Sequence, residues 1–297
     1  MAFNRLALRN IVYAIDVSGE FTASLWCAMA VARVRDADLR VVHVIPAAQA
    51  DVADDVISLR RSQMLDRLRA IVEESGALQP TLVGTAVRTG DPATEVLGLA
   101  RAISADLLVI GAPNVRTPER PAGPVASVVI SRSECPVLTV PAQARVNGNA
   151  AGFFTRIVCA VDTAPSCVSV IRQALSLAWE RHGHVTFVTV VARSSAISPA
   201  QTRDALAAEI PAEAREWCES EVVVARGEPG AEIVRVATES KADIVVIGAP
   251  RRWTSAAHGV LGHIACPVLV THDARPLPWP AAARDVGAAE GMNRSRS

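Results

Sequence analysis

Two aspartates occupy equivalent places in the sequence, each directly after a short apolar run. Asp16 ends the run NIVYAID at 10–16, and Asp162 ends the run RIVCAVD at 156–162. A carboxylate at the end of a buried strand accepts hydrogen bonds from a ligand, from nearby backbone N–H groups or from the start of the next helix. Ligand contact and local capping therefore both stay open for the two aspartates.

Other kinds of reactive site have no complete signature in this sequence. It contains no GxxxxGK[ST] phosphate loop and no GxSxG nucleophile elbow. Ser18 follows Asp16 by two residues, but no histidine is placed to activate it, so a role at a helix start is expected. The six histidines form no metal pattern, and no pair of cysteines forms CxxC. We expect no metal, and we expect the six cysteines to be small buried side chains.

The elements that position the two aspartates occur twice along the chain. After each aspartate comes a helical pattern, then a second apolar run, LRVVHVI at 39–45 or HVTFVTVV at 184–191. Polar, helix-compatible stretches follow at about 51–75 and 199–218, and third runs lie near 81–87 and 221–225. The segments 87–113 and 224–250 then align without a gap, and CPVL closes each copy at 135–138 and 266–269. The sequence is therefore an internal tandem repeat.

Strands that alternate with helices predict an α/β fold with parallel sheets and helices on both faces. We expect two tandem, open, five-stranded Rossmann-like domains at 1–143 and 153–273, followed by a disordered tail at 274–297. In such sheets, ligands bind outside the carboxyl ends of the strands, where the strand order reverses. The candidates there are Asp16 and Asp162, Val44 and Val190, and the loops that follow Gly111 and Gly248.

The composition of the chain indicates which classes of partner and which cellular compartment to expect. Thirty Lys and Arg balance thirty Asp and Glu, with no basic stripe, so neither nucleic acid nor a membrane surface is an expected partner. No apolar run reaches the length of a signal peptide core or a membrane span, and we expect a cytoplasmic protein.

Several of these motifs together resemble the universal stress protein family. The resemblance rests on the aspartate after the first run, His43-Val44, GDPA at 90–93, ADLLVIG at 105–111, ADIVVIG at 242–248, and CPVL in both copies. It covers about 9–141 and 155–272, called here the first and second copy. The resemblance implies dimerisation, often through the final strand. In a tandem chain it implies an intramolecular pseudo-dimer, with further homo-oligomers left open.

Some members of that family bind ATP, and these resemble the pattern Gly-x2-Gly-x9-Gly-Ser/Thr after the fourth strand. In the first copy Gly111 matches the first glycine, whereas Asn114 stands at the second. Gly123 fits the third glycine when counted back from Cys135, and Pro124 replaces the Ser/Thr. Proline has neither a hydroxyl nor an N–H group. The first copy therefore predicts a poor phosphate cradle.

The second copy departs further from the ATP-binding pattern. Gly248 is kept, Arg251 replaces the second glycine, and Ser255 falls at the Ser/Thr position. The offset between the copies falls from 137 residues at Gly248 to 131 at Cys266, so six residues are missing from this loop. A shortened loop cannot easily wrap a triphosphate, although Arg251 has the charge to contact phosphate.

The sequence leaves a ranked set of functions. The first is a non-catalytic stress-response or regulatory protein, which acts by binding a ligand or an unknown protein partner. The second is an ATP-binding protein whose nucleotide switches a surface. An enzyme of the wider fold class, such as a nucleotidyl transferase, ranks lower because the first strand is not followed by HxGH. The last is a structural role in which one degenerate copy supports the other. The sequence establishes no cofactor. An adenine nucleotide such as ATP stays open as a ligand.

Overall fold

The strands form where β-branched and other apolar side chains run together. The computed structural model describes residues 8–17, 21–46, 54–74, 83–112, 122–144, 154–162, 167–179, 182–194, 196–248 and 255–271, with the backbone alone at 54–57 and 255. The first copy contains β1 (Asn10–Ala14), α1 (Thr22–Arg35), β2 (Asp38–Pro46), α2 (Asp54–Glu74), β3 (Val83–Gly90), α3 (Pro92–Ala102), β4 (Leu107–Ala112), α4 (Pro124–Arg132) and β5 (Val137–Pro141).

The second copy repeats this order, with some elements shorter and an additional 3-10 helix. It contains β6 (Arg156–Ala160), α5 (Cys167–Ala178), β7 (His184–Val191), α6 (Pro199–Glu209), a 3-10 helix (Ala212–Glu216), β8 (Glu219–Arg226), α7 (Pro229–Glu239), β9 (Ile244–Gly248), α8 (Ser255–His263) and β10 (Val268–Thr271). The predicted tandem α/β architecture is confirmed, with five strands and four α-helices described in each copy.

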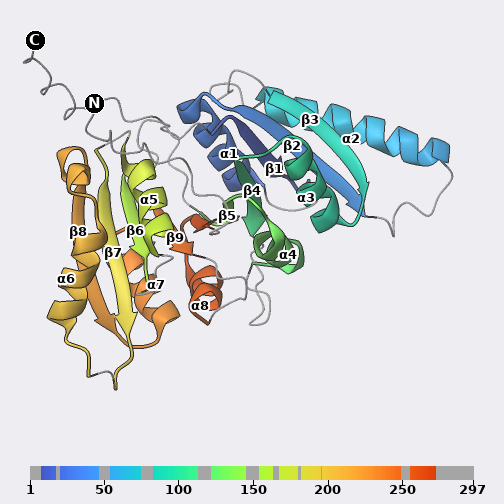
Figure 1. Ribbon diagram of the computed structural model, residues 1–297. Helices are drawn as coiled ribbons and strands as arrows, with labels where there is room; N and C mark the ends of the chain where they lie inside the picture. Colours follow the sequence, from blue (N-terminus) through green and yellow to red (C-terminus); the bar gives the residue numbers. More distant parts are fainter. Residues whose placement is uncertain are drawn as a thin grey trace, which may run out of the picture.

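All ten strands belong to one continuous sheet, in the order β3-β2-β1-β4-β5-β10-β9-β6-β7-β8 (Figure 1). Within each copy the described strand pairs are parallel, as predicted. The two five-stranded halves join through a single antiparallel pair, β5 with β10. The predicted intramolecular pseudo-dimer therefore forms through the final strand of each copy.

The junction between the copies has an internal two-fold relationship. Leu138 is the partner of Leu269, and these two residues hold the same place in the CPVL segments of the two copies. On either side, Val137 pairs with Val270 and Thr139 with Val268. The hydroxyl of Thr139 also donates a hydrogen bond to the carbonyl oxygen of Val268 at 3.2 Å. The pairing is thus isologous, as in a symmetric dimer of identical chains.

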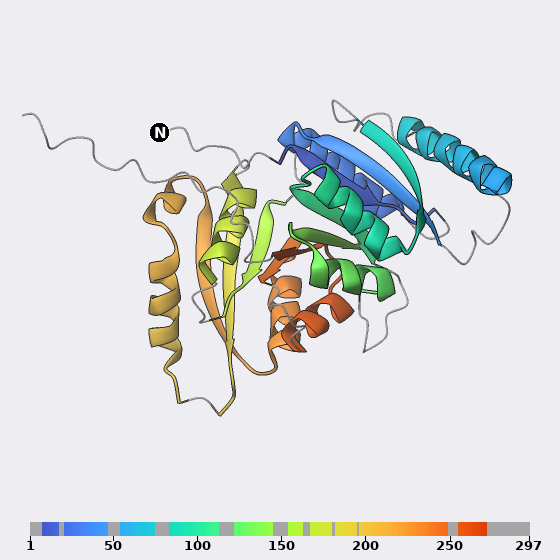
Figure 2. The ribbon, with the colours of Figure 1, turned by 45° about the vertical axis from the view of Figure 1, so that its right-hand side comes forward.

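Two hydrophobic layers cover the faces of the sheet, and both run through the junction. One layer contains buried residues of α1, α2, α5 and α6, together with Leu138 and Leu269. The other contains buried residues of α3, α4, α7 and α8, together with Val137 and Val268. Figure 2 shows α4 (green) and α8 (red-orange) side by side near this junction. Because each layer includes side chains from both copies, the two copies share their core.

The segments Gly90-Asp91-Pro92 and Gly227-Glu228-Pro229 form the starts of helices α3 and α7. Asp91 is the N-cap of α3 and accepts from the Thr94 N–H at 2.9 Å, and Glu228 caps α7 through the N–H groups of Gly230 and Ala231. Each is followed by a proline in the first turn, where the missing N–H costs nothing. These acidic side chains therefore satisfy helix N-termini.

Candidate functional site

The strand order reverses between β1 and β4 in the first copy and between β6 and β9 in the second. The chain leaves β1 toward α1 on one face and leaves β4 toward α4 on the other. A crevice between such diverging connections is where open α/β sheets bind ligands. The pseudo-dimer therefore has two equivalent candidate sites, one in each copy.

The structure brings the predicted aspartate and valine of each copy to the same edge. Ala14 pairs with Val42, so Asp16 and Val44 each lie two residues beyond that pair. Ala160 pairs with Val188, so Asp162 and Val190 are related in the same way. Both aspartates are exposed, whereas Val44 is buried and Val190 is half-buried. The carboxylates are accessible to a ligand, and their contact with one stays a prediction.

The loop that carries Asp16 is held from the α1 and α2 face. The carbonyl oxygen of Ile15 lies 3.0 Å from Nδ1 of His43, and because a carbonyl only accepts, the proton of this bond is on the ring nitrogen. The guanidinium of Arg67 in α2 donates to the carbonyl oxygen of Val17 at 3.3 Å. The sequence analysis missed both supports, since His43 sits inside an apolar run and Arg67 on a polar helix 50 residues away from Val17.

Helix packing explains the first glycine of each loop without any ligand. A Cβ placed on Gly111 would lie 3.3 Å from the hydroxyl oxygen of Ser24 in α1. A Cβ on Gly248 would lie 3.0 Å from a methyl group of Val170 in α5. Both distances are shorter than ordinary contacts, so glycine allows the first helix of each copy to approach the fourth strand closely.

Gly123 combines a conformational requirement with a position at a helix start. It is the N-cap of α4, with φ of 85° and ψ of 167°, a conformation that side chains with a Cβ rarely adopt. The N-cap glycine has no side chain that could cap this N-terminus, the first turn holds no acidic residue, and Pro124 lacks an N–H group. The N–H groups of Val125 and Ala126 therefore receive no cap from Gly123, and they lie at the positive end of the helix dipole.

The corresponding loop of the second copy is shorter. Residues 113–123 separate β4 from α4, whereas only residues 249–254 separate β9 from α8. Ser255 is the first residue of α8, and its side chain is not described. The other predicted loop and helix-start residues, Ser18, Asn114 and Arg251, lie outside the described residues. The roles predicted for these four residues therefore stay predictions.

The cysteines are packed as small apolar side chains, as the sequence predicts. Five are buried and Cys266 is half-buried. Burial raises the pKa of the Cys218 thiol to about 11 and that of Cys266 to about 12, which keeps both protonated at neutral pH. Within the described ranges, His, Cys, Asp and Glu side chains form no cluster of three or more that could hold a metal ion.

Many protein families share this fold class, and one family model matches both copies of this chain. A model of the universal stress protein family matches residues 7–141 and, a second time, residues 153–272. The chain belongs to the universal stress protein family. It is a tandem universal stress protein, in which both family domains lie in one chain and share one sheet. None of the described helices is long and apolar enough to cross a membrane.

Solved structures that span nearly the whole chain have the same tandem fold. A universal stress protein from Archaeoglobus fulgidus DSM 4304 matches with a TM-score of 0.73 and 15% identity, covering 90% of this chain and 97% of its own. A protein of unknown function from Pseudomonas aeruginosa PAO1 matches with a TM-score of 0.66 and 19% identity, covering 92% and 95%. At these identities the likeness concerns the fold alone. The comparison with curated proteins gave no match.

Single-domain universal stress proteins match one copy at a time. One from Archaeoglobus fulgidus, in complex with dAMP, has a TM-score of 0.35 and 26% identity, covering 40% of this chain and 98% of its own. Another universal stress protein is in complex with cAMP.

Proposed function

We propose that this universal stress protein is a non-catalytic regulatory protein that acts by binding a ligand or a protein partner. The observation that carries this proposal is the set of groups at the edge of the first copy. An exposed carboxylate at Asp16, a buried apolar side chain at Val44 and the N–H groups at the start of α4 hold a ligand by hydrogen bonding and burial. Recognition, rather than bond breaking, is what these groups do.

We further propose that the phosphate-binding loops are weakened in both copies. In the first copy, Pro124 occupies the first turn of α4 and supplies neither a hydroxyl nor an N–H group to a phosphate. In the second copy, six residues, 249–254, connect β9 to α8, which is too short a segment to surround a triphosphate easily. The loss of amide donors favours ligands with few phosphates over ATP.

One observation favours the second candidate function, a nucleotide-switched regulator that uses the first copy. Gly123 adopts a φ of 85°, and the α4 N-terminus that it begins has no side-chain cap. The helices α3 and α7 begin with an acidic cap, whereas α1 and α6, like α4, have no side-chain hydrogen bond from the N-cap residue. An uncapped positive helix end next to the strand-order reversal favours an anion such as a nucleotide phosphate.

Calorimetric titration of nucleotide-stripped protein separates the two functions. The ligands are Mg-ATP, AMP and cyclic AMP, and the variants are Asp16→Ala and its equivalent Asp162→Ala. Micromolar ATP binding that disappears in Asp16→Ala and persists in Asp162→Ala supports the nucleotide switch in the first copy. Absence of ATP binding in all three proteins removes the switch and leaves partner binding. Nucleotide turnover that is abolished in Asp16→Ala or Asp162→Ala contradicts a non-catalytic role.

A further inference from the structure

The outer strand of the first copy presents a long edge without a neighbouring strand. β3 pairs with β2 over all eight of its residues, from Val83 opposite Leu39 to Gly90 opposite Pro46. In the described part of the chain, no strand lies on its other side. Val87 alone among the eight residues is buried. Such an edge is a ready template for one more strand.

One contact shows which backbone groups face outward. The guanidinium of Arg61 in α2 donates to the carbonyl oxygen of Val87 at 3.2 Å, from the side away from β2. Alternate residues of a strand direct their backbone groups to the same side. The N–H and C=O groups of Thr85 and Thr89 therefore also face away from β2. From Thr85 to Thr89 this edge extends for about 13 Å.

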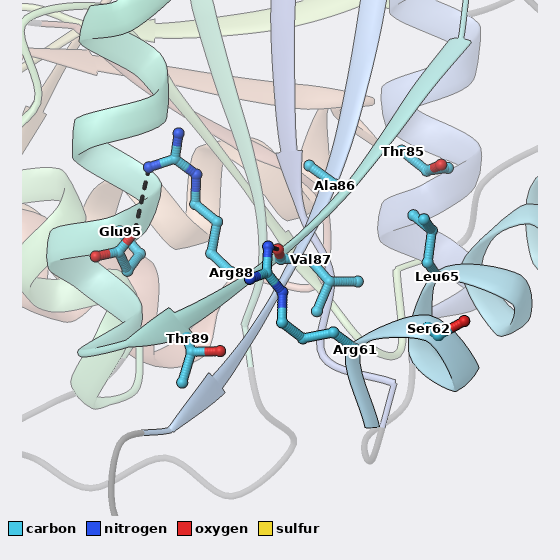
Figure 3. Close-up of a pocket in the computed structure, with 9 residues that line it drawn as sticks. All are labelled: Arg61, Ser62, Leu65, Thr85, Ala86, Val87, Arg88, Thr89 and Glu95. Carbon is cyan, nitrogen blue, oxygen red and sulfur yellow. Dashed lines mark hydrogen bonds and ion pairs between the residues drawn. The ribbon is translucent and has the colours of Figure 1, made fainter. Parts of the chain in front are cut away.

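A groove of about 660 Å³ runs along this edge (Figure 3). Arg61, Ser62 and Leu65 of α2 form one wall, and Glu95 of α3 lies at the other side of the strand. The floor is the strand itself, from Thr85 to Thr89. The buried hydroxyl of Thr89 makes no hydrogen bond with any described residue. The groove thus offers backbone groups that an added strand can satisfy.

The charges of the groove select the chemistry of its occupant. Arg61 is exposed, and its hydrogen bond to one carbonyl engages one of its five N–H donors. Arg88 forms an ion pair of 3.1 Å with Glu95, and both side chains are about one-third exposed. The lining of the groove therefore contains two guanidinium groups and one carboxylate, which leaves an excess of one positive charge. Arginine binds further carboxylates through paired hydrogen bonds.

We propose that the β3 groove binds an extended segment of another protein that carries carboxylate side chains, which adds to the sheet as an eleventh strand. Backbone hydrogen bonds to Thr85, Val87 and Thr89 supply the affinity, and Arg61 and Arg88 select acidic residues. In the unbound protein, Arg61 satisfies the Val87 carbonyl, and it moves to a carboxylate of the partner when the strand arrives. This docking surface is separate from the nucleotide question, since it lies two strands away from β1.

The test selects peptides from a displayed library of random dodecapeptides against the full-length protein. Selected peptides are synthesised and titrated against wild type and three variants. Thr85→Pro removes an outward N–H group while leaving the ladder with β2 intact. Arg61→Gln removes one of the two positive charges of the groove. Arg69→Gln is the matched control on the same helix, because Arg69 pairs with Asp66 outside the groove. Circular dichroism verifies that each variant is folded.

The proposal predicts selected peptides with Asp or Glu at alternate positions. Their affinity is expected to be unchanged in Arg69→Gln, at least tenfold weaker in Arg61→Gln, and absent in Thr85→Pro. Hydrogen exchange is expected to slow at the amides of Thr85, Val87 and Thr89 when peptide is bound. Equal binding to wild type and Thr85→Pro overturns the proposal, and so does a failed selection. Self-association of Arg61→Gln without peptide binding also overturns it, since Arg61 would then only protect the edge.

Discussion

Gly230 of α7 and Gly259 of α8 lie in direct backbone contact, so that a Cβ built on Gly230 would be 2.7 Å from the Cα of Gly259. The first copy has Ala93 and Val128 at the corresponding positions of α3 and α4. Two glycines thus let α8 approach α7 more closely than side chains would allow. The loop before α8 is also shorter than the loop before α4. The candidate site of the second copy therefore differs from that of the first copy in shape as well as in sequence.

Gly259→Ala is expected to lower the free energy of unfolding, because the new methyl group meets the Gly230 backbone at 2.8 Å. Overpacking of this kind costs about 1–3 kcal/mol. Gly98→Ala in α3 is the matched control, since its Cβ would meet nothing closer than 3.9 Å. That change is expected to raise stability by about 0.5–1 kcal/mol through helix propensity. Urea denaturation measures both, and an equal effect of the two changes contradicts the close crossing.

Leu138→Ala and Leu269→Ala are each expected to cost about 2–5 kcal/mol, because both side chains are buried at the junction. Since these residues face each other, the double variant is expected to lose less than the sum, by about 0.5 kcal/mol or more. Leu68→Ala with Leu269→Ala is the control pair, and its two costs should add. Denaturant titration of the five variants and wild type gives both couplings, and additive costs at Leu138 and Leu269 argue against the paired register.

Asp91→Ala is expected to lower the melting temperature at neutral pH and to have less effect in acid. Hydrogen bonds from Thr94 lower the pKa of Asp91. A carboxyl group whose pKa is lowered on folding stabilises the protein at a pH above the pKa that the group has in the unfolded chain, about 3.9. This stabilisation is lost as the pH falls through the pKa of the group in the folded protein. Asp91→Asn keeps the acceptor without the ionisation. Thermal unfolding from pH ~7 to ~3 should show the Ala variant converging on wild type, and a constant gap contradicts the prediction.

Tyr13 is expected to resist ionisation until the protein unfolds. Burial raises its pKa, although its hydrogen bond of 2.8 Å with Ser24 acts in the opposite direction. Because the folded pKa is raised, its contribution to stability is full below the unfolded value of about 10 and is lost as the pH rises beyond it. The chain has one tyrosine, so absorbance at alkaline pH reports on it alone. Tyrosinate formation in folded protein near pH ~10 would contradict its buried position.

Local pattern was enough to place most of the elements. The apolar runs predicted at 10–16, 39–45 and 184–191 correspond to strands at Asn10–Ala14, Asp38–Pro46 and His184–Val191. These runs are readable because parallel strands with both faces buried have apolar residues at nearly every position. The repeat then gave the tandem arrangement, since two copies of one pattern require two copies of one fold.

Contacts between segments far apart in the chain could not be predicted from the sequence. The support of the Asp16 loop by His43 and Arg67 depends on where β2 and α2 lie in space. The groove along β3 could not be predicted from the sequence either, because Arg61 and Val87 come into contact only when α2 packs beside the sheet edge. A polar residue on a helix carries no signal of which backbone carbonyl it will reach.

The antiparallel pairing of β5 with β10 directs the carboxyl ends of the two strand sets in opposite directions. Asp16 and Asp162 therefore open toward opposite margins of one sheet, and no small molecule can bridge them. A tandem chain of this kind has two equivalent site positions, as a symmetric dimer has. Unlike in a dimer of identical chains, the two sites do not need to have the same sequence. Each end is free to diverge toward a different ligand, while the stoichiometry between the two is fixed at one to one by covalent linkage.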